Sequence, residues 1–153
     1  MKHTRVSSTE VETIATSTLT VPTKGEGFID ITDEVARFLK ETDGQAGSVS
    51  LFIRHTSASL TIQENADPDV LADLITSLRR LAPADGGWRH TVEGPDDMPA
   101  HIKTMLTCSS LQIPVIGGSL ALGTWQAIYL IEHRAQPHSR EVVMQFMGSK
   151  RRA

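Results

Sequence analysis

The sequence has almost no cysteine and no long apolar run, which argues against a disulfide-bonded and a membrane-spanning protein. Its 153 residues include a single cysteine, Cys108, so no disulfide can form within the chain. This scarcity fits a reducing compartment, and we expect the protein to be cytoplasmic. No apolar run approaches the ~20 residues that a membrane-spanning helix needs, and residues 1–20 lack the apolar core of a secretion signal. We therefore expect a soluble protein that has no membrane partner.

Clusters of positive charge are also scarce. The formal net charge is −3 at pH 7, and the only basic run is Lys150-Arg151-Arg152. We interpret this run as a solvated tail and expect no nucleic-acid partner. Hydrophobic residues make up 39% of the chain, which argues against disorder. The length predicts one domain over residues 1–153, with a short flexible N-terminus.

The spacing of apolar residues predicts both strands and helices. Strands are expected at residues 11–21, 49–56, from 58 onward, 113–116, 120–132 and 142–147. A bend, bulge or new strand is expected near Thr56-Ser57, and a hairpin turn at Gly117-Gly118. Helices are expected around residues 31–39, from 68 to about 78, and from 99 in a short third helix. In the third helix the core-facing residues are expected to be Ile102, Met105 and Leu106, and in the second the apolar stripe is expected at Val70, Leu71, Leu74, Ile75 and Leu78. The segment 120–132 is apolar on both faces, so helices, another sheet or a partner subunit must cover it. This order predicts an α+β fold, with mostly antiparallel sheet covered by about three helices.

The stretch from Trp88 to Lys103 is the most informative part of the chain. It holds two histidines, three carboxylates and a lysine, and its Gly-Pro and Met-Pro breaks predict a loop. Asp97 and His101 fall near the start of the helix that Pro99 opens, where free backbone N–H groups favour anions. We therefore expect the functional site here.

Three histidines are candidate metal ligands: His55, His90 and His101. Neutral imidazole suits zinc, and catalytic zinc sites often use three protein ligands. The spacing of His90 and His101 matches no short metal motif, so structural histidines remain an alternative interpretation.

Polar residues also gather at the junction between the strand from residue 58 and the next helix. Glu64 and Asn65 can offer oxygen ligands to a cation such as magnesium, whereas Asp67 is expected to cap the helix. Helix capping by the whole group is the alternative. Gln126 follows Trp125 in an otherwise apolar strand, so its amide must find partners in the core or face a ligand.

Five segments of the chain resemble the YjbQ family, and the resemblance extends over roughly residues 11–148. The segments are His55-Thr56-Ser57-Ala58, Glu64-Asn65-Ala66-Asp67-Pro68, the run from His90 to Asp97, Pro99-Ala100-His101-Ile102-Lys103 and Leu122-Gly123-Thr124-Trp125-Gln126. This is a small-domain family without an assigned function that is often labelled secondary thiamine-phosphate synthase. That reaction joins a pyrimidine-methyl pyrophosphate to a thiazole phosphate and releases pyrophosphate.

The resemblance implies a compact α+β homotrimer with a divalent metal, zinc or magnesium, near His55, His90 and His101. Members of the family often carry asparagine where this chain has Asp97. Release of pyrophosphate needs charge neutralisation, which Lys103 and the helix start near Pro99 can supply.

We therefore expect a metal-dependent enzyme that acts on a phosphorylated small molecule, with thiamine-phosphate synthesis as the implied activity. The expected catalytic residues are His101, Glu64, Lys103 and Gln126, and the expected substrate-binding residues are Asn65, Asp97 and Trp125. The alternatives are a non-catalytic trimer that binds a metal or small anion, and a metal-dependent hydrolase.

Overall fold

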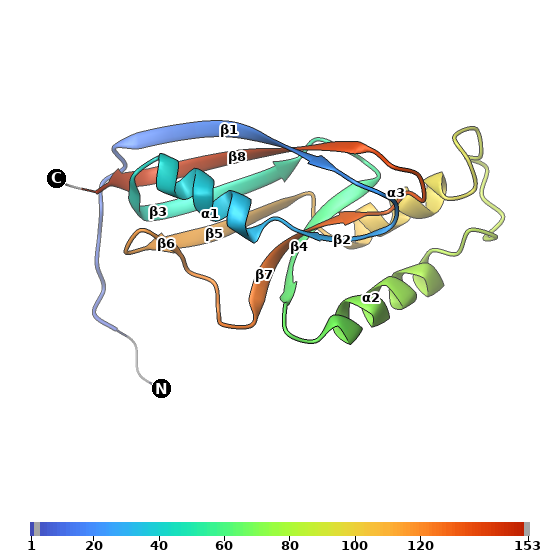
Figure 1. The fold of residues 1–153 in the computed structure, drawn as a ribbon, viewed down its shortest axis with the longest axis horizontal. Coiled ribbons are helices and arrows are strands. Elements are labelled where there is room, and N and C mark those ends of the chain that lie inside the picture. Colours follow the sequence, from blue (N-terminus) through green and yellow to red (C-terminus); the bar gives the residue numbers. More distant parts are fainter. Residues whose placement is uncertain (2–3, 152–153) are drawn as a thin grey trace.

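A computed structural model of the chain describes residue 1 and residues 4–151, and within these it contains two antiparallel sheets and three helices (Figure 1). His3 and Arg152, which fall in the expected tails, lie outside the described residues. The elements in chain order are β1 (Thr13–Pro22), β2 (Gly27–Asp30), α1 (Thr32–Glu41), β3 (Gly44–Ile53), β4 (Ala58–Glu64), α2 (Pro68–Leu81), α3 (Asp97–Leu106), β5 (Ser110–Ile116), β6 (Ser119–Leu120), β7 (Gln126–Glu132) and β8 (Ser139–Lys150).

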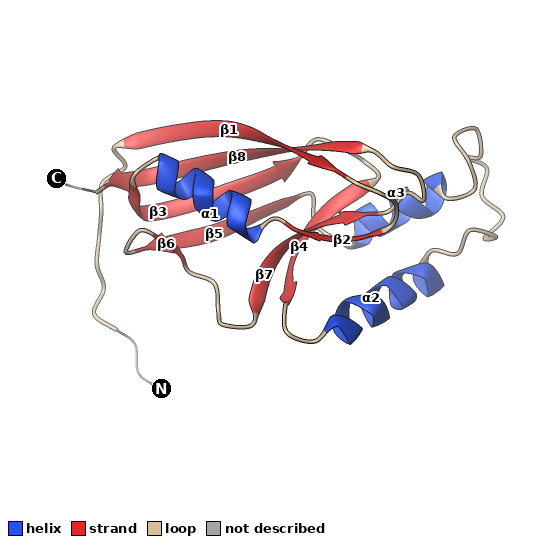
Figure 2. Ribbon diagram, in the orientation of Figure 1, coloured by secondary structure: helices blue, strands red, loops and turns tan. Residues whose placement is uncertain are grey.

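The larger sheet has the strand order β1-β8-β3-β5-β6 and the smaller one has the order β2-β7-β4. Helix α1 lies across the larger sheet, whereas α2 and α3 lie beside the smaller one (Figure 2). The core lies between these layers and includes Val35, Leu39, Leu51, Leu130 and Phe146, each no more than 2% exposed. This architecture confirms the predicted α+β fold with mostly antiparallel sheet.

Helix α2 forms where its end signals predict it. Asp67 is the N-cap and its side chain accepts a hydrogen bond from the Asp69 backbone N–H at 2.9 Å, while Pro68 occupies the first helical position. The predicted apolar stripe exists but is only half-buried along its length, at Val70, Leu71, Leu74, Ile75 and Leu78. Helix α2 therefore packs at the margin of the fold and leaves apolar surface uncovered.

The predicted strand 120–132 is wrong in its first half. Strand β6 ends at Leu120 and β7 begins at Gln126, because a turn interrupts the chain between them. The Gly123 N–H donates to Gln126 Oε1 at 2.8 Å, and the Gln126 N–H donates to the Gly123 carbonyl at 3.0 Å. After Gln126 every residue of β7 is buried within the chain. The short strand β2 was not predicted.

The predicted orientation of the third helix is also wrong. Helix α3 begins at Asp97, and Met105 and Leu106, which we expected to face the core, are 79% and 52% exposed. The buried face instead carries Pro99 and Lys103. Burial of this lysine is possible because its Nζ lies 2.5 Å from Glu26 Oε1, and the carboxylate offsets the loss of water.

The bend predicted near Thr56-Ser57 is confirmed, because β3 ends at Ile53 and β4 begins at Ala58 in the other sheet. Two residues of the run interpreted as a solvated tail instead contact the fold, since Lys150 belongs to β8 and the Arg151 N–H donates to the Asp43 carbonyl at 2.8 Å. None of the helices in the described part of the chain is both long and apolar enough to cross a membrane.

Candidate functional site

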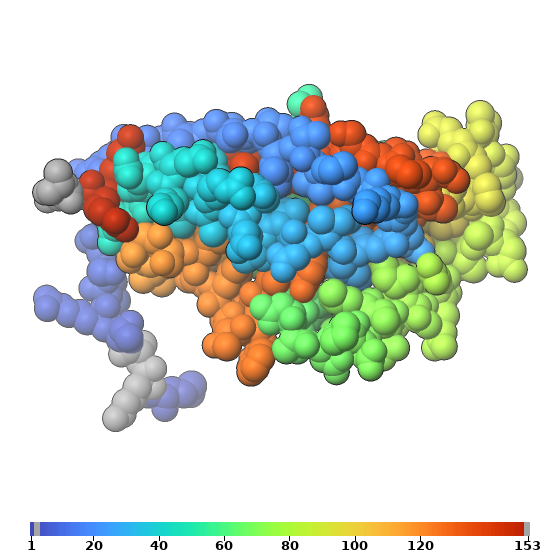
Figure 3. All heavy atoms as spheres, viewed as in Figure 1, coloured from blue at the N-terminus to red at the C-terminus, as the bar shows by residue number. Residues whose placement is uncertain are grey.

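Two histidines and a carboxylate meet where α3 begins; His90, Asp97 and His101 are called the histidine cluster below. His90 lies in the loop after α2, which projects at one end of the molecule (Figure 3), and His101 follows Asp97 by one helical turn. Asp97 Oδ2 is 2.6 Å from His90 Nε2 and 3.3 Å from His101 Nε2. The three ligand atoms all lie within 4.8 Å of one another. The loop and the helix predicted from the sequence thus bring these three side chains together.

The hydrogen bonds of His101 decide which of its nitrogens carries a proton. Its Nδ1 lies 2.9 Å from the Thr56 carbonyl oxygen, which can only accept, so we infer that Nδ1 is protonated. In a neutral ring the lone pair is then on Nε2, which faces Asp97 Oδ2. Two acceptors facing each other repel, and a cation between them removes this repulsion. The backbone carbonyl also fixes the ring orientation, as partners of metal-binding histidines commonly do.

Arg134 holds the carboxylate of the cluster in place. The Asp97 side chain is only 2% exposed, and its second oxygen, Oδ1, accepts a hydrogen bond from Arg134 Nη1. The same guanidinium donates to Asp96 Oδ2 at 3.1 Å and to the Glu93 carbonyl at 2.6 Å. Burial raises the pKa of Asp96, but hydrogen bonds from the Ala135 N–H and from Arg134 outweigh it and keep the pKa below its ordinary value. The loop that carries the cluster is therefore fastened to the end of β7.

The histidine cluster fits a divalent metal ion. Two imidazoles and one carboxylate are a donor set of catalytic zinc sites and of other transition-metal sites. Two ligands about 2.0–2.1 Å from a tetrahedral ion lie about 3.3 Å apart, close to the separation of Asp97 Oδ2 and His101 Nε2. His90 Nε2, at 2.6 Å, is at hydrogen-bond distance from the same oxygen and would have to move away to share an ion with it. The side chains of His90 and His101 are 44% and 33% exposed, so one side of the cluster is open to a ligand.

His55, the third predicted metal ligand, lies outside the cluster. Its Nε2 accepts a hydrogen bond from the Glu141 N–H at 2.9 Å, and Arg140 Nη1 lies 3.5 Å from its Nδ1. Burial, and then the charge of Arg140, lower the pKa of His55. His55 and His101 nevertheless line the same surface depression, which has a volume of 530 Å³. The third member of the cluster is Asp97, which we expected to bind substrate, and not His55, which we expected to bind the metal.

Four predicted site residues form a second group at the far end of β4: Glu64, Asn65, Trp125 and Gln126, called the β4 end group below. The Asn65 N–H donates to the Trp125 carbonyl at 3.2 Å, and Glu64 lies opposite Gln126 in the sheet. Both Glu64 carboxylate oxygens accept from the Asp67 N–H, at 3.2 and 3.3 Å. Trp125 is 64% exposed. These contacts make the group partly structural.

The structure does not bring the β4 end group to the histidine cluster. Thr56, which contacts His101, comes just before β4, whereas Glu64 is its last residue. Seven residues of strand have a length of about 20 Å, too far for side chains to share a ligand-sized site.

Lys103, a predicted catalytic residue, also lies apart from the cluster. It follows His101 by two residues, which on a helix is a rotation of about 200°, so the two side chains leave α3 in nearly opposite directions. The Lys103 side chain is 6% exposed and pairs with Glu26. Burial raises the pKa of Glu26, but hydrogen bonds from Lys103 and Arg79 outweigh it and lower the pKa.

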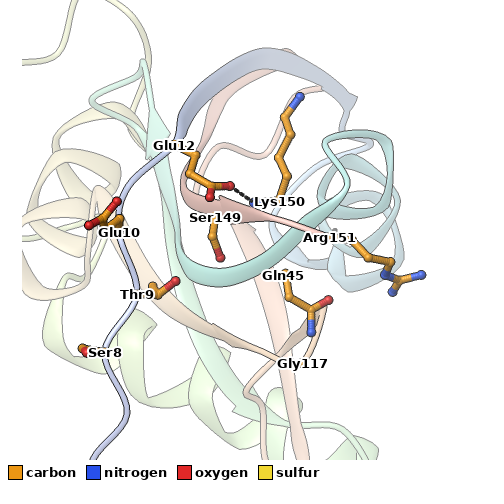
Figure 4. A pocket seen from close by; sticks show the side chains of 9 residues that line it. All are labelled: Ser8, Thr9, Glu10, Glu12, Gln45, Gly117, Ser149, Lys150 and Arg151. Atoms are coloured by element: carbon orange, nitrogen blue, oxygen red, sulfur yellow. Dashed lines mark hydrogen bonds between the residues drawn. The ribbon is translucent and has the colours of Figure 1, made fainter. Parts of the chain in front are cut away.

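A larger hollow lies away from the histidine cluster. It has a volume of 860 Å³ and lies between the N-terminal segment and the end of β8 (Figure 4). Its lining is polar, and the Lys150 N–H donates to Glu12 Oε2 at 3.1 Å. Figure 4 shows that the side chains of Lys150 and Arg151 point in different directions, so they do not converge on a ligand.

Sequence reasoning missed three residues that surround α3: Glu26, His133 and Arg134. His133 directly follows β7 and is 2% exposed. Glu26 and Arg134 reach α3 from chain positions 77 residues before Lys103 and 37 residues after Asp97. No local pattern marks such distant contacts, so the sequence offered no signal for them.

Comparison with known proteins gives consistent matches. The family described as UPF0047 protein YjbQ-like matches residues 17–149. The UPF0047 protein sll1880 of Synechocystis is 47% identical over 85% of this chain and 89% of its own length. The UPF0047 protein YjbQ of Escherichia coli O157:H7 is 42% identical over 86% of this chain and 96% of its own.

Solved structures show the same fold. The hypothetical protein APE1520 of Aeropyrum pernix K1 superimposes with a TM-score of 0.81 at 30% identity, over 88% of this chain and 99% of its own. The conserved hypothetical protein TT1486 of Thermus thermophilus gives a TM-score of 0.74 at 41% identity, over 83% of this chain and 97% of its own. None of these four names states an activity.

Proposed function

Because the chain belongs to the UPF0047 family of YjbQ-like proteins, whose function is unknown, we propose a function from the geometry of the site: a metal-dependent enzyme that acts on a phosphorylated small molecule. A divalent ion is held by His90, Asp97 and His101. The observation that carries this proposal is the single buried carboxylate oxygen, Asp97 Oδ2, facing Nε2 of both histidines.

The donor set favours zinc, or another metal that prefers imidazole, over magnesium, which takes oxygen ligands. Such an ion, when bound, supplies Lewis-acid chemistry to a phosphoryl oxygen or a water. The residues around it orient the ligands. Arg134 holds Asp97 through Oδ1 and leaves Oδ2 for the ion, and the Thr56 carbonyl keeps the His101 Nε2 lone pair directed at the same place.

The substrate would lie in the depression beside His101. Its rim includes the exposed side chains of Phe52 and Met105, which are 51% and 79% exposed, next to the polar groups of Thr104 and Ser109. This mixture suits a small molecule with an apolar ring and a phosphate that reaches the metal. Thiamine-phosphate synthesis, which the resemblance implies, joins two substrates of this kind and is the first reaction to test.

The β4 end group can take part only if another copy of the chain supplies it. We therefore include the homotrimer in the proposal, with Glu64, Asn65, Trp125 and Gln126 of one chain near the histidine cluster of the next. The exposed Trp125 ring and the half-buried apolar stripe of α2 support a partner at that end. A cytoplasmic location is part of the same proposal.

One observation favours a second candidate function. Lys103, expected to neutralise the departing pyrophosphate, is paired with Glu26 on the opposite side of α3 from His101. A metal-dependent hydrolase does not require that lysine. A non-catalytic protein that binds a metal and a small anion requires no catalytic residue at all. Both alternatives use the same three ligands.

The experiment uses the protein loaded with zinc or magnesium and given both precursors, with thiamine phosphate measured by mass spectrometry. A panel of phosphate esters and lactones tests hydrolysis in parallel. The variants are His101→Ala and, as a matched control outside the cluster, His138→Ala, each checked for folding by circular dichroism.

Multiple turnovers that are lost in His101→Ala and kept in His138→Ala would support an enzyme with this site. Turnover that persists in His101→Ala would contradict the site. Absence of any product from metal-loaded protein would contradict the enzyme and leave the binding function. Light scattering that shows a monomer at micromolar concentration would contradict the trimer.

A further inference from the structure

A second pocket lies on the side of α3 that faces away from the histidine cluster. It has a volume of 330 Å³ and lies among α2, α3 and the chain that follows β7; we call it the α3 pocket. Its ionisable lining residues are Glu26, Arg79, Asp96, Lys103 and His133. The rest of the lining is small and apolar: Ala82, Pro83, Ala84, Pro99 and Ala135.

His133, which lines this pocket, has an unpaired polar atom. The residue is 2% exposed and its Nε2 lies 2.8 Å from Ser59 Oγ, but its Nδ1 is buried and has no partner within the described part of the chain. Burial, and then the charge of Lys103, lower the pKa of His133 to about 4, so the ring is neutral at pH 7. Buried polar groups almost always have a partner. A bound molecule in the pocket would supply one.

The cations of the pocket also have unused donors. An ammonium has three N–H groups, and the one contact of the buried Lys103 Nζ within the described residues is with Glu26 Oε1. Arg79 donates through Nε to Glu26 Oε2 at 2.6 Å, which leaves the terminal nitrogens of its guanidinium available. Each oxygen of Glu26 therefore already accepts one hydrogen bond from a cation.

The other carboxylate of the pocket, Asp96, has partners outside the pocket cations. Asp96 Oδ2 accepts from Arg134 Nε and from the Ala135 N–H, and its Oδ1 lies 3.5 Å from Arg134 Nη2. The α3 pocket thus presents N–H groups of Lys103 and Arg79 that have no acceptor within the described residues, beside the unpaired Nδ1 of His133. A ligand that satisfies it must bring acceptor oxygens.

We propose that the α3 pocket binds a small organic oxyanion, a carboxylate or phosphate ester group carried on a short apolar body. The oxyanion accepts hydrogen bonds from Lys103, Arg79 and the Nδ1–H of His133, and the body lies against the alanine and proline side chains. Ser59 then donates its hydroxyl proton to His133 Nε2. This site is separate from the metal site, and the proposal does not rest on the proposed function.

The test is a titration of the metal-free protein, followed by long-range ¹H–¹⁵N NMR of the His133 ring. The probes are butyrate and n-propyl phosphate, which distinguish the two oxyanions, and 1-butanol is the uncharged control. We expect saturable shifts of His133 with at least one oxyanion, a ring protonated on Nδ1, and no saturation with 1-butanol. Absence of saturable shifts with both oxyanions, or equally tight binding of 1-butanol, would overturn the proposal.

Two variants of adjacent residues on α2 sharpen the test. Arg79→Gln removes a partly exposed donor and should weaken binding about fivefold, the upper range for an exposed ion pair. Arg80→Gln makes the same change at a residue that does not line the pocket and should leave binding unchanged. Equal effects of the two variants would show that only the net charge matters and would contradict the site.

His101→Ala separates this inference from the metal site. The variant should bind the oxyanion as the unmodified protein does, because His101 lies on the other side of α3. Loss of binding in this variant would show that the ligand occupies the histidine cluster instead, and would overturn the α3 pocket as a separate site.

Discussion

Protonation of His133 should contribute strongly to how the stability of the metal-free protein depends on pH. Burial and the charge of Lys103 lower its pKa from 6.5 to about 4 in the folded chain. The unfolded chain then binds more protons below pH 6.5, so the free energy of unfolding decreases as the pH falls from 6.5 to about 4. This gap corresponds to about 3 kcal/mol, of which about 2 kcal/mol is lost between about pH 7.5 and pH 5.

The assay is urea unfolding in the presence of a chelator, which prevents metal release from contributing to the pH dependence. Over this range the unmodified protein should lose about 2 kcal/mol more than His133→Asn, which has no titrating ring. The pKa values of Glu26 and Glu132 are lowered because hydrogen bonds outweigh burial. The stability that these two carboxylates contribute is therefore lost only as the pH falls below their ordinary pKa of 4.5, outside this range. His138→Asn is the matched control and should keep the original profile. A His133→Asn profile identical to that of the unmodified protein would refute the reasoning.

Three further changes test the account of the fold. Arg140→Met leaves the fully buried Glu132 carboxylate without its main partner and should cost about 3–5 kcal/mol in urea unfolding. Glu141→Gln breaks only the exposed pair with Arg54 and should cost less than about 1 kcal/mol, so equal losses would contradict the difference in burial. Gln126→Ala removes the side-chain bond that closes the turn before β7 and should cost about 1 kcal/mol by thermal or urea unfolding. Unchanged stability in that variant would show that the side chain does not support the turn.

The sequence predicted the elements whose ends carry strong local signals. Asp67 and Pro68 fixed the start of α2, and the Gly117-Gly118 pair gave the expected turn, with φ of 61° and 80°. The apolar residues of α3 were misleading, because Met105 and Leu106 are exposed and Lys103 is buried instead. A distant partner decided that orientation, and helical periodicity contains no information about such a partner.

The part of the candidate site that lies within one short segment was predicted, and the part that depends on distant segments was not. His90 and His101 stood out because they share a loop and a helix start, and Asp97 joins them because it precedes His101 by one turn. Trp125 and Gln126 continued an apolar pattern, so a turn there was not visible. The contribution of Arg134 depends on the path of β7, which no local pattern reveals.

The most direct test of the central claim is a zinc-binding measurement on the protein and its histidine variants, made by isothermal titration calorimetry. We predict about one zinc ion per chain for the unmodified protein, loss of binding in His90→Ala and His101→Ala, and unchanged binding in His55→Ala. Absence of zinc binding by folded protein, or loss of binding in His55→Ala with retention in His101→Ala, would contradict a metal site at the histidine cluster.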